Sequence, residues 1–284
     1  SRGPIQNKQT LIAKNLLPEP GGLFDPLLTG GREGTLYAHI DLPEPIPNPV
    51  FREPVRRLLG LSEKDFEQRL GQDGGQWFQD RLRTLDVANE LKRIRAQLKT
   101  AKGSVLNDLV KQHKYLEALQ KEGLRPHTAY MTSKVAVIPP VFRPILPQPG
   151  SAGELMVADA NKLYAHLMDS AKTLRETALE VDRPKHRQKV YNAVAALYGT
   201  EDVDNDKLQG QGVKGFLANI AGVGTPKGGF FQRKVLRKNQ DVSGRGTIVP
   251  DPTLGLDEVG LPEDMLWQMY DKLIVARLIR TGFP

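Results

Sequence analysis

The sequence contains no cysteine, which excludes disulfide bonds and every zinc site built on thiolate ligands. Its five histidines stand singly, without the spacing that two metal ligands on one helix need. The acidic run at 201–206 lacks the glycine and the closing glutamate of a calcium loop, so we interpret it as a solvated loop. No metal ligand is predicted in this chain.

Long apolar runs are also missing. No stretch approaches the roughly 18 apolar residues of a membrane-spanning helix, and the mean hydropathy is −0.41. The first residues, S-R-G-P-I-Q-N-K-Q-T, are polar and lack the apolar centre of a secretory signal. We therefore expect a cytoplasmic protein that has no membrane partner.

Positive charge is what the sequence has in excess. Its 284 residues include 40 Lys and Arg against 33 Asp and Glu, a net charge of +7. Hydrophobic residues make up 39% of the chain, which is enough to form a core. The excess of cations favours a polyanionic partner, because Lys and Arg displace the counterions that surround phosphates.

Glycine and proline divide the chain into segments. Residues 1–60 are predicted to be mostly irregular, with a short strand near 35–40, and the proline-rich run 43–49 can be neither helix nor central strand. Residues 62–83 have a helical pattern with breaks at Gly71 and at 74–75. Farther along, we expect residues 134–149 to be extended and 157–199 to form two helices divided near 182–184.

The clearest local pattern predicts an antiparallel helical hairpin. Apolar residues alternate at spacings of four and three, and a second set follows Gly103 and ends at Gly123, a typical helix cap. The first set is Val87, Leu91, Ile94, Leu98, Ala101 and Val105, and the second is Leu109, Gln112, Leu116 and Leu119. The polar faces are mainly basic. Two interpretations stay open: charges that only keep the hairpin soluble, or a projecting arm that binds a partner.

A glycine-rich basic stretch spans residues 209–250. Its G-Q-G-V-K-G lacks the preceding strand and the later acidic residue of a dinucleotide site, and no Gly-Lys-Ser/Thr completes a phosphate loop. Glycine lets the main chain approach phosphates closely, so nucleic-acid contact is one interpretation of its cations. These cations are Lys227, Arg233, Lys234, Arg237, Lys238 and Arg245, with Asp241 as the one acid among them.

Short segments in a fixed order carry a resemblance to a known family. The segments D-V-S-G-R-G-T-I-V-P and L-G-L-D-E-V-G-L-P follow one another within 241–262. Before them come G-L-F at 22–24, H-I-D-L at 39–42, I-P-P-V-F-R-P at 138–144, D-A-N-K-L-Y at 159–164 and A-V-A-A-L-Y at 193–198. In this order they resemble the N-terminal part of the beta-prime subunit, the largest subunit of multisubunit DNA-directed RNA polymerase.

The resemblance implies an α+β fold. An irregular clamp region with a projecting antiparallel helical hairpin would be followed by helices that lead into the first strands of a double-psi β-barrel. The implied parts are 1–83, the clamp N-terminal region without a zinc ribbon, and 84–123, the clamp coiled-coil hairpin. They continue with 124–208, a rudder-like segment and clamp helices, and 209–284, a switch-like basic segment and the start of the barrel.

The same resemblance implies binding roles. The hairpin would dock a sigma-like initiation factor through Arg93, Arg95, Lys99 and Lys102. The basic cations at 227–245 would contact template DNA and the RNA–DNA hybrid. Other partners would be a beta-like subunit and the remaining beta-prime-like parts.

Two departures from the family pattern have consequences. Only about fourteen residues separate G-L-F from H-I-D-L, without cysteine, so the zinc ribbon is absent. The N-A-D-F-D-G-D loop, whose carboxylates hold the catalytic Mg²⁺, is not in the sequence either. The metal would then be held by another chain or by residues not present here, and this chain supplies no catalytic residue. Such a divided subunit is similar to those of jumbo bacteriophages, whose locations would be the host cytoplasm or the virion; an excerpt of a longer subunit is the other interpretation.

The favoured function is a component of a DNA-dependent RNA polymerase, a nucleotidyltransferase only as part of its complex. The alternative is a non-catalytic clamp mimic that regulates transcription by capturing an initiation factor. The basic stretch favours the former, because a mimic would need only the hairpin. An independent nucleic-acid-binding protein fits less well, since the apolar faces at 1–60 and 262–279 call for neighbours.

Overall fold

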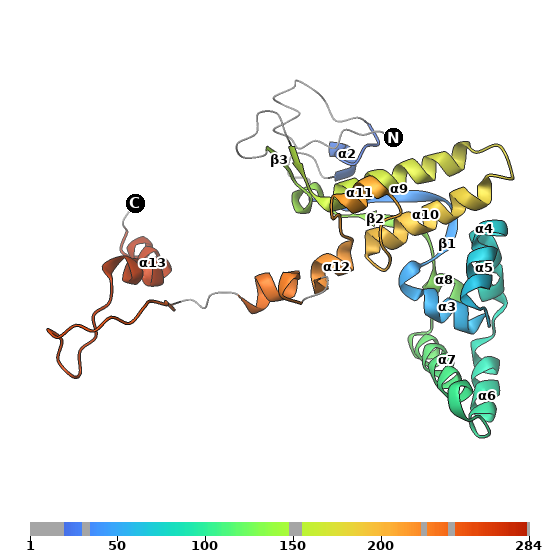
Figure 1. The fold of residues 1–284 in the computed structure, drawn as a ribbon, viewed down its shortest axis with the longest axis horizontal. Coiled ribbons are helices and arrows are strands. Elements are labelled where there is room, and N and C mark those ends of the chain that lie inside the picture. The colour runs from blue at the N-terminus through green and yellow to red at the C-terminus, as the bar shows by residue number, and fades with distance from the viewer. Residues whose placement is uncertain (1–19, 30–34, 148–154, 223–225, 238–241, 283–284) are drawn as a thin grey trace. The chain divides into compact units, whose positions relative to one another are not determined.

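The computed structural model describes residues 20–29, 35–147, 155–222, 226–237 and 242–282 (Figure 1). The chain forms two compact units, residues 1–220 and 221–284. Helices predominate and the strands form small antiparallel sheets, which confirms the predicted α+β class. Among the helices that the structure describes, none has the length and apolar character of a membrane span.

The first unit is organised around a two-stranded antiparallel sheet, β1 (Ala38–Pro47) with β2 (Met131–Val137). The side chains of Val135 and Val137 are fully buried beneath it. Strand β1 extends through the proline-rich run, farther than the short strand predicted near 35–40. Its register is irregular between Asp41 and Ile46, and both strands are sheet edges, so the missing proline donors interrupt no central ladder.

Helices α3 (Arg52–Leu58), α4 (Glu63–Gln72) and α5 (Gly74–Thr84) follow β1, and α5 packs on that strand. The predicted break at 74–75 is confirmed: Gly74 has φ +72°, and a Cβ on Gly75 would lie 1.5 Å from the Pro45 carbonyl oxygen. The predicted break at Gly71 is wrong. That glycine lies inside α4, because a helix tolerates a single glycine.

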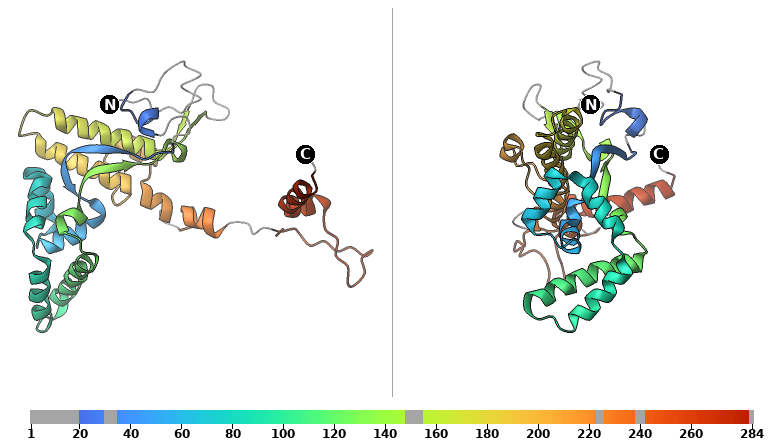
Figure 2. Two further views of the ribbon diagram at one scale, coloured as in Figure 1. Left: turned by 180° about the vertical axis from the view of Figure 1, so that it is seen from behind. Right: turned by 90° about the vertical axis from the view of Figure 1, so that its right-hand side faces the viewer.

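The predicted helical pair consists of α6 (Val87–Leu98) and α7 (Gly103–Glu122), which lie side by side in both views of Figure 2. Their shared seam is buried at Leu91, Ile94, Leu116 and Leu119. Val105 does not continue the first seam. The chain has reversed at Gly103 (φ +63°), so Val105 belongs to α7 and is 58% exposed. Helix α7 ends at left-handed Gly123, as predicted.

A second helical pair, α9 (Asp159–Glu176) and α10 (Arg183–Tyr198), packs against α4 and β1, with the predicted division between the helices. Tyr191 of α10 joins Phe66 and Phe78 in an aromatic cluster at the centre of the core. The remaining elements of this unit are short: α2 (Pro26–Thr29), a 3-10 turn at Pro49–Phe51, α8 (Pro126–Tyr130), a 3-10 turn at Pro140–Phe142, the paired β3 (Ile145–Pro147) and β4 (Leu155–Val157), α11 (Asp206–Gly210) and α12 (Phe216–Ala221).

The second unit contains a 3-10 turn (Pro226–Gly228), a π-helical turn (Phe231–Leu236) and α13 (Glu263–Arg280). The expected first strands of a barrel are not formed in the described residues from 235 onward: 231–236 are π-helical, and 242–262 contain neither helix nor strand. A strand needs a neighbour to take its backbone hydrogen bonds, and this stretch has none in the described unit. Its apolar side chains are exposed accordingly, Ile248 at 96%.

Candidate nucleic-acid and partner-binding surfaces

A fully buried arginine lies where three of the motif segments meet. The Arg143 side chain is 0% exposed. Its Nη1 donates to Asn161 Oδ1 at 2.9 Å, its Nε donates to the Ile138 carbonyl at 2.7 Å, and its Nη2 donates to the Leu23 carbonyl. In return, Asn161 Nδ2 donates to the Arg143 carbonyl at 2.8 Å. The G-L-F, I-P-P-V-F-R-P and D-A-N-K-L-Y segments are therefore joined through one guanidinium.

The charge of Arg143 is held by dipoles rather than by a carboxylate, since no described residue forms an ion pair with it. Its guanidinium lies 4.4 Å from the centre of the Phe24 ring, a cation–π contact. Burial lowers the pKa of Arg143 to about 10. A buried charge of this kind is tolerated only while its hydrogen-bond acceptors stay in place.

Tyr164, on the next turn of α9 after Asn161, holds the same segment from the other side. Its hydroxyl accepts from the Ile138 N–H and donates to the Ala136 carbonyl, both at 3.0 Å. Burial raises the pKa of Tyr164 to about 12, so the hydroxyl keeps the proton that it donates. We call Arg143, Asn161 and Tyr164 the buried polar cluster. It fixes residues 136–143 to α9.

The predicted docking cations lie on α6 and on the turn that follows it, and the structure divides them into two groups. Arg93 is bound to Glu90 at 2.6 Å, and Arg95 Nε donates to His113 Nε2 at 3.1 Å across the hairpin. Lys99 and Lys102 are exposed in the turn between the helices. Arg93 and Arg95 thus have partners within the hairpin, whereas Lys99 and Lys102 have no ion-pair partner among the described residues.

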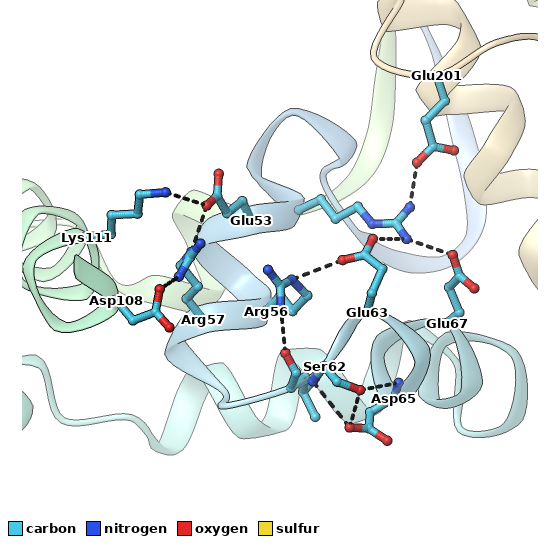
Figure 3. Close-up of polar contacts among 12 residues, drawn as sticks. Glu53, Arg56, Arg57, Ser62, Glu63, Asp65, Glu67, Asp108, Lys111 and Glu201 are labelled. Carbon is cyan, nitrogen blue, oxygen red and sulfur yellow. Dashed lines mark hydrogen bonds and ion pairs between the residues drawn. The ribbon is translucent and has the colours of Figure 1, made fainter. Parts of the chain in front are cut away.

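Polar contacts attach the first half of α7 to α3 (Figure 3). Arg57 binds Asp108 of α7, Lys111 Nζ lies 3.5 Å from Glu53 Oε1, and Gln112 Nε2 donates to the Arg57 carbonyl at 3.0 Å. The hydrogen bond from Arg57 lowers the pKa of the Glu53 carboxyl. These contacts tie the first half of α7 to α3 without involving Lys99 or Lys102.

Of the predicted nucleic-acid cations, those that the structure describes lie in the second unit. Lys227 is exposed in the 3-10 turn, Arg233 in the π-helical turn, and Arg237 directly after it. Lys234 also lies in the π-helical turn, and Lys238 lies outside the described residues. Arg245 is exposed beyond 238–241. None of the four described side chains forms an ion pair with another described residue, so their charges are available to a ligand.

The S-G-R segment is held by close backbone packing against α13. A Cβ on Gly244 would lie 2.4 Å from Met265 Cε and 2.9 Å from Met269 Sδ, so a side chain there would require the ends of these methionines to move. Val242 adopts φ +59°, a left-handed conformation that is unusual for a β-branched residue. The glycine contact brings the backbone next to Arg245 against the helix. Such close packing and backbone strain are typical of segments placed for a function.

Within the described residues, no group of three or more histidine, aspartate and glutamate side chains is arranged to hold a metal ion. The acidic loop is engaged in other contacts instead. Glu201 binds Arg52 at 2.5 Å, and Asp204 lies 3.0 Å from His166.

Comparison with known proteins gives a consistent result. The beta-prime subunit of DNA-directed RNA polymerase from Neisseria gonorrhoeae is 30% identical over 247 residues, which are 81% of this chain and 17% of that protein. The beta-prime subunits of Sulfurovum and Stenotrophomonas maltophilia are 29% and 31% identical over 249 and 228 residues.

This chain is similar to beta-prime subunits of RNA polymerase along about four fifths of its length. It spans about a sixth of the length of these relatives, with 16% and 17% of the proteins from Sulfurovum and Neisseria covered. No family model matches the chain.

Sequence reasoning missed the buried polar cluster. Arg143 and Asn161 were noticed only as letters in two motifs, although an arginine among prolines and apolar residues is a signal of a buried or bound cation. The sequence could not show that Arg143 donates to the Leu23 carbonyl, because Leu23 is 120 residues away along the chain.

Proposed function

We propose that this chain is a clamp-forming part of a multisubunit DNA-directed RNA polymerase. The observation that carries the proposal is the similarity to beta-prime subunits over 81% of the chain. The buried polar cluster supports it, because the motif segments that resemble the family also contact one another in the fold. Residues that surround the same buried guanidinium depend on one another, because the loss of one leaves another without its hydrogen-bond partner.

Within this role, the second unit contacts template DNA and the RNA–DNA hybrid. The exposed cations Lys227, Arg233, Arg237 and Arg245 support this, because no described carboxylate neutralises them. Lys234 and Lys238 belong to the same stretch and add to its charge. Lysine and arginine on a glycine-rich backbone suit phosphates without selecting a sequence.

A sigma-like initiation factor docks on a helical hairpin of the first unit. The proposed surface is the flank of α6 at Arg93 and Arg95, with Lys99 and Lys102 at its end. The first unit has a second helical pair, α9–α10, whose connection exposes Leu179 at 67% and Val181 at 90%. Any docking experiment therefore has to compare both hairpins.

Catalysis belongs to another part of the enzyme. The N-A-D-F-D-G-D loop is not present in this sequence, so the Mg²⁺ that aligns the reacting nucleotides is held elsewhere. This chain's contribution to nucleotidyl transfer is to hold the nucleic acid. We further propose that this chain works together with a beta-like subunit and the remaining beta-prime-like parts of the enzyme.

Co-purification tests the proposal. The full chain, tagged and expressed in its native context, is expected to purify with a polypeptide that carries N-A-D-F-D-G-D and with template-dependent RNA synthesis. Purification with an initiation factor but without any polymerase subunit would instead support the clamp mimic. Purification as a single species without either partner would contradict both functions.

A further inference from the structure

The distal half of the α6–α7 hairpin carries positive charge alone. Residues 91–107 contain no aspartate or glutamate. The cations of this stretch are Lys92, Arg93, Arg95, Lys99 and Lys102. The acids on either side are already engaged, Glu90 with Arg93 at 2.6 Å and Asp108 with Arg57. The charged side chains around the turn are therefore all positive.

The main chain at the turn adds to this potential. Helix α7 begins at Gly103, after Lys102, without a side-chain cap and without an acidic residue in its first turn. The N–H groups at the start of a 20-residue helix carry a partial positive charge. Lys99 and Lys102 both precede this helix start, in the turn, and both are exposed.

The side chains around the turn indicate which polyanion fits. Residues 87–114 contain no Phe, Tyr or Trp, so the turn offers no ring on which unpaired bases could stack. Its exposed large apolar side chains are only Val105 at 58% and Val110 at 37%. A protein interface usually needs aromatic or large apolar anchors at its centre. A duplex needs neither, since its regular phosphate backbone is recognised by charge.

Position also suits a rigid ligand. The seam at Leu91, Ile94, Leu116 and Leu119 is buried. The first half of α7 is tied to α3 through Asp108 (Figure 3) and through Gln112. These contacts do not involve Lys99 or Lys102, so a ligand bound by those two side chains displaces none of them. The hairpin is therefore held by its buried seam and by α3, and its turn carries exposed lysines.

We propose that the turn between α6 and α7 binds the phosphate backbone of double-stranded DNA through Lys99 and Lys102. This site is separate from the basic stretch of the second unit, and it does not depend on the proposed polymerase activity. It gives a second role to two of the predicted docking residues, Lys99 and Lys102, which lie at the end of the proposed factor surface.

The test compares two variants of the full chain that change the net charge equally. Lys99→Glu with Lys102→Glu removes the cationic turn. Lys64→Glu with Lys207→Glu is the control, because both lysines are exposed and both have carboxylate neighbours in sequence. Affinity for a short DNA duplex of mixed sequence and for a single strand of equal length is measured over a range of salt concentrations. Circular dichroism and thermal unfolding show that each variant is folded.

The turn variant is expected to bind the duplex about tenfold more weakly, with the salt slope reduced by about 1 to 2, as the loss of one or two phosphate contacts requires. Its affinity for the single strand stays within about twofold, because that probe uses the second unit. Equal duplex losses in the control, or an unchanged salt slope in the turn variant, would overturn the proposal. Loss of initiation-factor capture with unchanged duplex affinity would also overturn it and would make the turn a protein-docking surface.

Discussion

Arg143 and Asn161 exchange two hydrogen bonds, at 2.9 Å and 2.8 Å, inside the first unit. The Asn161 side-chain amide accepts a hydrogen bond from the Arg143 guanidinium and donates one to the Arg143 backbone carbonyl. The Asn161 side chain is as fully buried as that of Arg143. The pair holds a buried positive charge without a described carboxylate, so its stability depends on these dipoles.

Asn161→Ala is expected to lower the free energy of unfolding by about 2 to 4 kcal/mol, because it leaves a buried guanidinium N–H and a buried carbonyl without partners. Urea unfolding followed by circular dichroism measures the change. The matched control is Asn89→Ala, an exposed asparagine of α6 whose loss is expected to cost no more than about 0.5 kcal/mol. Similar losses in the two variants would show that Arg143 does not depend on Asn161.

Tyr164 makes the stability of the fold sensitive to alkaline pH. An unfolded tyrosine loses its proton near pH 10, whereas the buried one keeps it up to about 12. The stabilisation is therefore complete below pH 10 and is lost as the pH rises from 10 toward 12.

The unfolding free energy of Tyr164→Phe is expected to fall less steeply between pH 10 and 12. The slope differs by up to about 1.4 kcal/mol per pH unit, because the variant lacks the one proton that Tyr164 releases on unfolding. At neutral pH the variant is less stable by about 1 to 2 kcal/mol, because the Ile138 N–H loses its acceptor. Urea midpoints at several pH values measure both effects. Parallel curves for the two proteins would contradict the assignment.

Gly75→Ala is expected to destabilise the first unit by about 3 kcal/mol or more, since the new Cβ would overlap the Pro45 carbonyl and push α5 away from β1. Gly210→Ala in α11 is the control, because no atom lies within 4 Å of its added Cβ. We expect it to be neutral or to add about 0.5 kcal/mol through the unfolded state. Thermal unfolding compares them, and equal stability would mean that α5 does not cross β1 as closely as described.

Lys238→Ala together with Arg245→Ala is expected to weaken template binding and elongation without dissolving the assembly. Removal of two phosphate contacts should reduce the salt slope of binding by about 2 and the affinity by about tenfold. Salt-dependent binding of a template–RNA hybrid by the assembled enzyme measures this. An unchanged slope would count against the proposed contact.

Charge reversal at Arg93 and Arg95 is expected to abolish promoter-specific initiation and to spare factor-independent transcription. The physical reason is repulsion where a complementary charge docked before. The comparison variant is Lys185→Glu with Lys189→Glu, exposed cations of α10. If only the comparison variant loses promoter-specific initiation, factor docking belongs to α9–α10. If neither variant loses it, neither helical pair docks the factor through these charges.

Local patterns predicted part of this structure. The apolar spacing of Leu91 and Ile94 predicted the seam of α6, and Gly123 ends α7 as its φ of +65° requires. The same kind of reasoning placed a break at Gly71, which lies inside α4, because a helix tolerates a single glycine.

Long-range pairing escaped prediction. Strand β1 continues past Pro43 and Pro45 because β2, nearly a hundred residues later, pairs with it on both sides of them, at 38–41 and at 46–47. The prolines fall at the irregular part of the register, where missing donors matter least. Sequence order alone gives no register between such distant segments.

By itself, the sequence determined the helices, the excess of positive charge, the absence of thiolate ligands and the ordered resemblance to beta-prime subunits, because each depends on residues close together in the chain or on composition. Only the tertiary structure decided that Arg143 is a buried junction and that Arg93 and Arg95 already have partners within the hairpin. It also decided that the turn at Lys99 and Lys102 carries its charge unneutralised among the described residues. Those properties depend on which side chains the fold brings together, and charge acts through space rather than along the sequence.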